Sequence, residues 1–184
     1  MNICIFPGTF NPIHAAHLKM AEFALNRYNF DKVIFIPSYI PPHKNISKNL
    51  AKHRFNMVKL AISGNSKFEI SDIEYKTEGK SYTLITVKKI IDEHKIKGRL
   101  NFIIGTDAFL NIKTWYHADE LKDLLHFIVF PRGNDIINDI DFLGYSYELA
   151  DAPKINLSST DLRLCRESNI RTIKEYIEQN ELYN

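Results

Sequence analysis

The sequence predicts an α/β fold: a doubly wound, mainly parallel Rossmann-like sheet with helices on both of its faces. Short apolar runs alternate along the chain with stretches in which apolar residues recur at helical spacing. The apolar runs are continuous, as in KVIFI at residues 32–36, which is typical of strands buried on both faces of a parallel sheet. Ligands of such sheets bind beyond the carboxyl ends of the strands, so the loops that follow strands are the candidate functional segments.

The individual elements follow from these patterns. Short apolar runs predict strands at residues 3–6, 32–36, 68–73, 100–104 and 127–130. Helical spacing predicts helices at residues 16–28, 50–63 and 82–95. A polar, proline-containing loop is expected at residues 38–49 and a turn-rich stretch at 134–152. A helical part from about residue 158 to 184 should pack on the rest, which makes residues 1–184 a single domain.

Composition limits the class of protein. The 184 residues carry a formal net charge of +2, too small to indicate binding to nucleic acid or to an anionic membrane. No apolar run is long enough to span a bilayer, and the first residues, MNICIFPG, lack the features of a signal peptide. The two cysteines, Cys4 and Cys165, fit free thiols in a reducing compartment better than a disulfide. We therefore expect a cytoplasmic protein that binds neither nucleic acid nor membrane.

The loop after the first predicted strand carries the most informative segment, GTFNPIHAAH at residues 8–17. A strand, a glycine-containing loop and a helix N-terminus form a phosphate site, because backbone N–H groups and the helix dipole both favour an anion. His14 and His17 are three residues apart, so both imidazoles fall on one face of the first helical turn. The alternatives are a zinc site, which would need further ligands, or two ordinary surface histidines.

A second segment, INLSSTDLR at residues 155–163, places Ser158, Ser159 and Thr160 ahead of a helical pattern. Hydroxyl side chains and free amides at a helix start can hold a phosphate, and Arg163 in the first turn can add a cation. The alternative is a plain N-cap followed by a solvent-exposed arginine.

Two segments in the middle of the chain can also contribute to a site. In PPHK at residues 41–44 the prolines stiffen the loop, so that Lys44 is presented as a cation; the alternative is a solvated turn. Ser81 or Thr83 is expected to cap the helix predicted at residues 82–95.

Two more candidates follow the fourth predicted strand. Gly105 and Asp107 lie in the loop just beyond it, where an acid can bond ribose hydroxyls or, alternatively, cap the next helix. Trp115 and Tyr116 offer aromatic faces that can stack on a planar heterocycle, although ordinary core packing is the alternative.

These segments carry a resemblance to a known family. GTFNPIHAAH resembles the (H/T)xGH motif of the nucleotidyltransferase superfamily, with Ala16 and Asn11 where that motif usually has Gly and Asp, and LSSTDLR resembles its ISSTxxR motif. PPHK, the R-x-x-M pair Arg54 and Met57, SYT, the GxD loop, the tryptophan and the closing Leu-Tyr are similar to the bacterial nicotinate-mononucleotide adenylyltransferase family. Ile85 stands where that family often has Asp.

The resemblance implies a single nucleotidyltransferase domain that transfers AMP from ATP to nicotinate mononucleotide, giving deamido-NAD and pyrophosphate in NAD biosynthesis. Two alternatives stay open. One is another adenylyltransferase, with nicotinamide mononucleotide or phosphopantetheine as acceptor. The other is a nucleotide-binding regulatory module without turnover. Assembly into a homo-oligomer is also left open.

The resemblance also implies a set of site residues. The catalytic residues would be His14, His17 and Arg163. The ATP-binding residues would be Gly8, Thr9, Phe10, His14, His17, Gly105, Asp107, Ser159, Thr160 and Arg163. The residues that bind the mononucleotide would be Thr9, Lys44, Thr83, Trp115 and Tyr116. Mg²⁺ would be held mainly by the ATP phosphates and water rather than by the chain. The loop at residues 38–49 is the first candidate for movement around the substrates.

Overall fold

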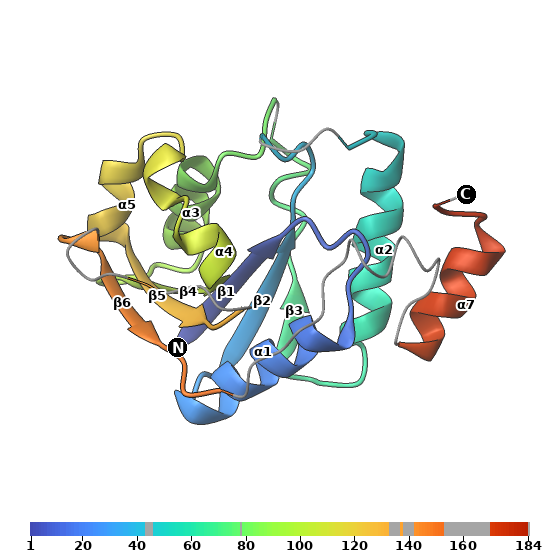
Figure 1. Ribbon diagram of the computed structural model, residues 1–184, viewed down its shortest axis with the longest axis horizontal. Helices are drawn as coiled ribbons and strands as arrows, with labels where there is room; N and C mark the ends of the chain where they lie inside the picture. The colour runs from blue at the N-terminus through green and yellow to red at the C-terminus, as the bar shows by residue number, and fades with distance from the viewer. Residues whose placement is uncertain (43–45, 78, 133–136, 138–141, 153–169, 184) are drawn as a thin grey trace.

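A parallel sheet forms the centre of the molecule in the computed structural model, which describes residues 1–42, 46–77, 79–132, 137, 142–152 and 170–183 (Figure 1). Within these residues the sheet has six strands in the order β3-β2-β1-β4-β5-β6, and every neighbouring pair is parallel. The strands are β1 (Ile3–Gly8), β2 (Lys32–Pro37), β3 (Phe68–Ile70), β4 (Leu100–Gly105), β5 (Leu125–Phe130) and β6 (Ser146–Leu149). The predicted doubly wound α/β fold is confirmed.

The helices cover both faces of this sheet. They are α1 (Ala15–Arg27), α2 (Asn49–Ile62), α3 (Thr83–Glu93), α4 (Thr106–Phe109), the 3₁₀ turn η1 (Ile112–Thr114), α5 (Ala118–Leu124) and α7 (Arg171–Gln179). In Figure 1, α3, α4 and α5 lie over one face of the sheet, whereas α1, α2 and α7 lie over the other. Within the described residues, no helix is long and apolar enough to cross a membrane.

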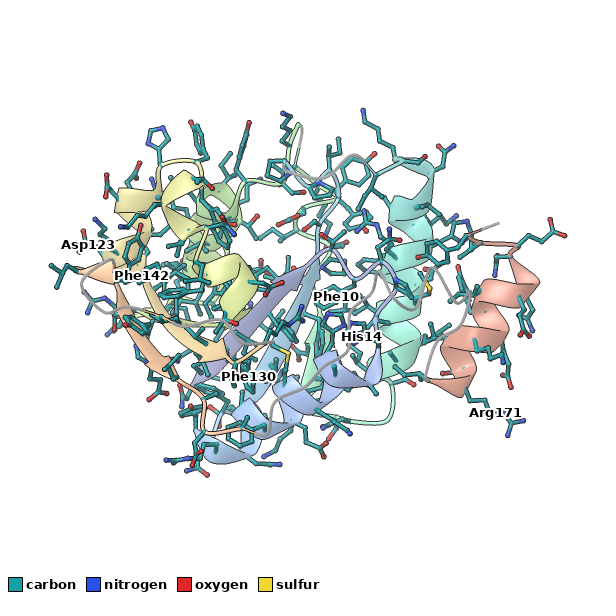
Figure 2. All side chains as sticks on the ribbon, viewed as in Figure 1. Phe10, His14, Asp123, Phe130, Phe142 and Arg171 are labelled. Atoms are coloured by element: carbon teal, nitrogen blue, oxygen red, sulfur yellow. The ribbon has the colours of Figure 1, made fainter. Side chains whose placement is uncertain are left out.

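Two apolar cores lie between the sheet and its helices, one on each face. Successive side chains of a strand point to opposite faces, so Cys4 and Phe6 join the core under α1 and α2, and Ile3 and Ile5 join the core under α3. In Figure 2, Phe130 marks the first of these cores and Phe142 the second. This burial on both faces explains why the strands appear in the sequence as continuous apolar runs.

Sequence patterns missed the shorter elements. Helices α4, η1 and α5 and the edge strand β6 were not expected, and β3 ends at Ile70 rather than at residue 73. Only Leu121 of α5 is buried and its neighbours are mostly charged, so the helical period is hardly visible. Strand β6 is a half-exposed edge strand, SYEL, and lacks the apolar run that marks the inner strands.

Helix α7 lies within the C-terminal part that the sequence predicts to be helical, and it packs against α2. Ile173 and Ile177 are buried in the core under α2. The Tyr176 hydroxyl accepts a hydrogen bond from Asn56 Nδ2 at 3.1 Å and lies 3.1 Å from His53 Nδ1. These contacts fix the end of the chain beside α2, as Figure 1 shows. Residues 153–169, including Cys165, lie outside the described residues, whereas Cys4 is a buried free thiol.

Candidate active site

A large cavity opens where the strand order reverses. The chain winds outward in one direction from β1 to β3 and in the other from β4 to β6, so β1 and β4 are neighbours at the switch point. A cavity of about 1090 Å³ lies at this point and is lined by the loops that leave β1, β2 and β4. This is the position at which open parallel sheets bind their ligands.

The loop after β1 forms the floor of the cavity. A Cβ on Gly8 would lie 2.8 Å from the nearest ring carbon of Phe10, so only glycine fits beneath that ring. Phe10 has a positive φ of 45° and packs edge-on against Phe6 and His17, with ring centroids 5.5 and 5.0 Å away. The tight curl of this loop therefore depends on Gly8 and on the aromatic packing of Phe10, which Figure 2 places near the centre of the molecule.

A buried arginine joins this loop to the loop after β2. Arg54 of α2 is fully buried; its Nη1 donates to the carbonyl oxygen of Thr9 at 2.8 Å and its Nη2 to that of Tyr39 at 3.1 Å. Ser38 N–H donates to the carbonyl oxygen of Gly8 at 2.9 Å. The planar guanidinium carries several N–H donors in a fixed fork, so one arginine can donate to both loops. The sequence analysis identified Arg54 only as part of a family motif and did not predict that it is buried. Its position within an apolar helical pattern could have indicated this burial.

The two histidines occupy different environments. His14 is the N-cap of α1 and His17 lies one turn later, with their rings stacked at a centroid distance of 3.6 Å. His17 lines the cavity, whereas His14 is completely buried and does not. His14 N–H donates to His17 Nδ1 at 3.3 Å, so a neutral His17 carries its proton on Nε2.

Burial also keeps the His14 ring neutral. Desolvation, followed by the positive charge of Arg132, lowers the pKa of His14 from 6.5 to about 4. Within the described part of the chain, neither ring nitrogen of His14 has a hydrogen-bond partner. The prediction that both imidazoles occupy the first turn of α1 is confirmed, but only His17 reaches the cavity in this geometry.

An acid and an arginine meet at the rim of the cavity. Asp107 lies in the first turn of α4, whose N-cap is Gly105, and Arg132 follows β5. Arg132 Nη1 is 3.4 Å from Asp107 Oδ2, and Arg132 N–H donates to Thr106 Oγ1 at 2.9 Å. A Cβ on Gly105 would lie 2.5 Å from Asp107 Oδ1, so the glycine makes room for this pair. Sequence reasoning missed Arg132, although its position two residues after a predicted strand was a usable signal.

Aromatic side chains form another wall. Trp115 is half-buried and its ring centroid lies 6.2 Å from that of Phe102. Tyr116 stacks on Tyr82 with ring centroids 4.6 Å apart and an interplanar angle of 32°. Thr83, the first residue of α3, lines the cavity beside them. The cavity thus has an aromatic side as well as a side built from a helix N-terminus and backbone amides.

The prediction that Ser81 or Thr83 caps α3 is wrong. Tyr82 is the N-cap and makes no capping hydrogen bond through its side chain. The Ser81 hydroxyl instead accepts from the N–H groups of Tyr39 and Ile40, at 2.9 and 3.1 Å. Buried Glu74 also accepts from Tyr39 N–H, at 3.2 Å, so the tertiary contact with the loop after β2 takes the place of the local cap.

Most of the expected site residues meet at this cavity. Those that line it are Gly8, Thr9, Phe10, His17, Thr83, Gly105, Asp107, Trp115 and Tyr116. His14 lies behind His17 and does not line it. The remaining ones, Lys44, Ser159, Thr160 and Arg163, lie outside the described residues.

Comparison with known proteins agrees with this geometry. The family model described as Cytidylyltransferase-like matches residues 5–164. A probable nicotinate-nucleotide adenylyltransferase of Caldicellulosiruptor saccharolyticus is 40% identical over 197 residues, covering 100% of this chain and 99% of the relative. The chain belongs to the nicotinate-nucleotide adenylyltransferase family. It is therefore a nucleotidyltransferase enzyme.

Other members of this family extend the comparison. A probable nicotinate-nucleotide adenylyltransferase of Synechococcus sp. (strain JA-2-3B'a(2-13)) is 37% identical, with 98% of this chain and 96% of the relative covered. The solved structure of Plasmodium falciparum nicotinic acid mononucleotide adenylyltransferase complexed with NaAD superposes with a TM-score of 0.81 at 25% identity, covering 99% of this chain and 97% of that one. The fold is thus shared over nearly the full length of both chains.

Proposed function

We propose that this enzyme transfers AMP from ATP to nicotinate mononucleotide, giving deamido-NAD and pyrophosphate, a step of NAD biosynthesis. The observation that carries the proposal is one cavity of about 1090 Å³ that joins a phosphate-type loop and His17 to an aromatic wall. This volume is at the upper end of the about 300–1000 Å³ usual for one small ligand, and the two different walls of the cavity suit the two nucleotides of the proposed reaction. The names of the family relatives support the same pair of substrates.

In the proposed reaction a phosphate oxygen of the mononucleotide forms a bond to the α-phosphorus of ATP. The bond from that phosphorus to the oxygen bridging to the β-phosphate breaks, and pyrophosphate leaves with the electron pair. The attacking phosphate is already an anion at neutral pH, so the chain needs no general base. Its task is to align the two substrates and to stabilise charge on the transferring and leaving phosphates.

The described residues divide this task between them. We expect the Nε2–H of His17 and the backbone N–H groups of the curled loop at residues 8–11 to donate to phosphate oxygens. Asp107, which lines the cavity, would bind a ribose hydroxyl. Trp115, Tyr116 and Thr83, which also line it, would contact the pyridine ring and its carboxylate. His14 would act through its stacking on His17 rather than from the cavity.

The residues outside the described part keep their proposed roles. Ser159, Thr160 and Arg163 would hold the leaving pyrophosphate, and Lys44 would hold the triphosphate or the incoming mononucleotide. Their support is the sequence motif and the family membership.

Mg²⁺ is the metal we propose to accompany ATP. Within the described residues no three His, Cys, Asp or Glu side chains come together, and Asp107 is the one carboxylate among the described residues that line the cavity. That donor set fits an ion held mainly by phosphate oxygens and water, with at most one carboxylate from the chain. When bound, Mg²⁺ would neutralise charge on the phosphates.

We further infer that residues 1–184 act as one nucleotidyltransferase domain, with the C-terminal helical part, about 158–184, packed on it. The contacts of α7 with α2 support this arrangement. A cytoplasmic location is proposed because Cys4 is a free thiol. A homo-oligomer stays a prediction, which the mass of the purified protein in solution would test.

The deciding experiment measures pyrophosphate release from ATP and Mg²⁺ with nicotinate mononucleotide in one reaction and nicotinamide mononucleotide in the other. Release that strongly favours the nicotinate form supports the proposal. Equal release would refute the acceptor preference but keep the chemistry. No release with either acceptor, while ATP still binds, would favour a different acceptor or a regulatory module.

A further inference from the structure

The end of the chain reaches the candidate active site. The Tyr183 hydroxyl donates to Asn11 Oδ1 at 2.6 Å, across 172 residues of sequence, and both residues line the cavity. Asn11 is buried and lies between the curled part of the β1 loop and His14, the N-cap of α1. A side chain from the C-terminus therefore contacts the segment that carries the proposed phosphate-binding groups.

The tail that presents Tyr183 is anchored immediately before this contact. Leu182 is buried in the core under α2, and its N–H donates to the carbonyl oxygen of Ile177 at 3.1 Å. Glu181 and Tyr183 have left-handed backbones, with φ of 51° and 65°. Such a conformation is unfavourable for a non-glycine residue and persists only where the surroundings enforce it. The tail thus adopts an unfavourable turn that delivers Leu182 to the core and the Tyr183 hydroxyl to Asn11.

Two further contacts on this loop secure a different part of it. Ser38 N–H donates to the carbonyl oxygen of Gly8, and Arg54 donates to that of Thr9. Both contacts hold the beginning of the loop through its backbone. The Tyr183 contact holds the side chain of Asn11, which is closer to the start of α1. Loss of the Tyr183 hydroxyl would therefore loosen the stretch that leads into His14 and His17, while the loop stays attached at Gly8 and Thr9.

We propose that Tyr183 is a positioning residue for nucleotidyl transfer: its hydroxyl fixes Asn11 and thereby the loop and first helical turn that align the phosphates. The inference rests on the proposed function for its kinetic consequence. Its structural consequence, a loop held by the C-terminal tail, is independent of which acceptor the enzyme uses.

The kinetic test compares Tyr183→Phe with Tyr176→Phe. Both changes remove only a tyrosine hydroxyl from the same C-terminal part, but that of Tyr176 contacts α2 and does not line the cavity. We expect Tyr183→Phe to lower kcat for pyrophosphate release about tenfold, with a smaller change in KM, because alignment rather than substrate binding is lost. Tyr176→Phe should stay within about twofold of wild type. A Tyr183→Phe enzyme with wild-type kcat, or the same loss in both variants, would overturn the proposal.

A double-mutant cycle tests whether Tyr183 acts through Asn11. Asn11→Asp keeps an oxygen that can accept from the hydroxyl, whereas Asn11→Ala removes it. Tyr183→Phe should therefore lower kcat in the Asn11→Asp background but add nothing in the Asn11→Ala background. A further loss of kcat when Tyr183→Phe is added to Asn11→Ala would show that Tyr183 does not act through Asn11.

Hydrogen exchange separates this proposal from the assignment of the reaction. The amide hydrogens of residues 11, 13 and 14 should exchange faster in Tyr183→Phe than in wild type, and their exchange should be unchanged in Tyr176→Phe. This readout needs no turnover, so it holds even if wild type releases no pyrophosphate with nicotinate mononucleotide. Unchanged exchange of these amides in Tyr183→Phe would refute the positioning role whatever the reaction.

Discussion

Two histidines of the same motif lie in different environments, because only one of them lines the cavity. His17 lines the cavity, and the N–H of His14 occupies its Nδ1, which leaves Nε2–H as its donor in the neutral form. His14 is enclosed, and burial together with Arg132 lowers its pKa to about 4. The spacing of the pair in the sequence predicts that they lie on one face, but it does not predict which of them meets the ligand.

Replacing His17 by Ala should lower turnover a hundredfold or more, which corresponds to about 3 kcal/mol of transition-state stabilisation, typical of a lost oxyanion donor. The measurement is pyrophosphate release by the purified variant, with its thermal unfolding as a check that the fold survives. His126→Ala is the matched control, because His126 lies on β5 outside the residues that line the cavity. Near wild-type turnover of His17→Ala would remove His17 from the mechanism.

His14 should make the folded protein sensitive to acid. Its pKa is lower in the folded state than its ordinary value of 6.5, so the unfolded chain binds a proton first as the pH falls. The contribution is fully present above pH 6.5 and is lost between about pH 6.5 and 4, up to about 3 kcal/mol.

The check is the free energy of unfolding as a function of pH for wild type and His14→Gln, whose side chain does not titrate. The variant should lose less stability than wild type over that interval. Parallel curves for the two proteins would contradict the buried, neutral state of His14.

At the scale of elements, buried polar residues join segments that line the cavity. Arg54 ties the loop after β1 to the loop after β2, and Glu74 ties the loop after β2 to α3. Glu74 is buried, which raises the pKa of its carboxyl above the ordinary value, while hydrogen bonds from Ser81, Thr86 and Tyr39 act in the opposite direction. The relative position of these segments thus depends on one cation and one acid, together with the hydrogen bonds of Ser38 and Ser81.

Glu74→Gln should disturb the wall that faces the mononucleotide. The carboxyl accepts from Thr86 Oγ1 at 2.9 Å and Tyr39 N–H at 3.2 Å, and an amide would place its NH₂ against one of these donors. We expect the KM for nicotinate mononucleotide to rise about tenfold, equivalent to about 1.4 kcal/mol. Glu120→Gln, on exposed α5 and paired with Lys88, is the control. Equal KM values in the two variants would contradict this role.

At the scale of the whole molecule, the ligand site lies between the two halves of the sheet. One half is β1 to β3 with α1 and α2, and the other is β4 to β6 with α3 to α5. The cavity takes residues from both, so a nucleotide bound there would contact both halves of a single sheet. Binding should therefore stabilise the folded chain as a unit.

A non-hydrolysable ATP analogue at about 100 times its Kd should raise the free energy of unfolding by about 2.7 kcal/mol. For a chain of this size that is about 5–11 °C in Tm. The measurement is thermal unfolding followed by near-ultraviolet and far-ultraviolet circular dichroism, whose transitions should shift together. A shift in only one of the two signals would contradict stabilisation of the molecule as a unit.

The sequence by itself determined the parallel sheet and most of the cavity. Continuous apolar runs located β1, β2, β4 and β5, since a strand buried on both faces needs apolar side chains at every position. Motif residues after those strands, such as Thr9, His17 and Asp107, reached the cavity because the carboxyl ends of parallel strands meet at one edge.

Tertiary structure alone decided which residues support that cavity. Long-range contacts are made by four supporting residues: Arg54, Glu74, Arg132 and Tyr183. Another long-range contact, from Tyr39 N–H to the Ser81 hydroxyl, takes the place of the helix cap that Ser81 was expected to form. Local periodicity records which face of an element is apolar, whereas a long-range hydrogen bond depends on how elements pack and turn against one another. For this reason the positions of the site residues were readable from the chain, and the partners that hold them were not.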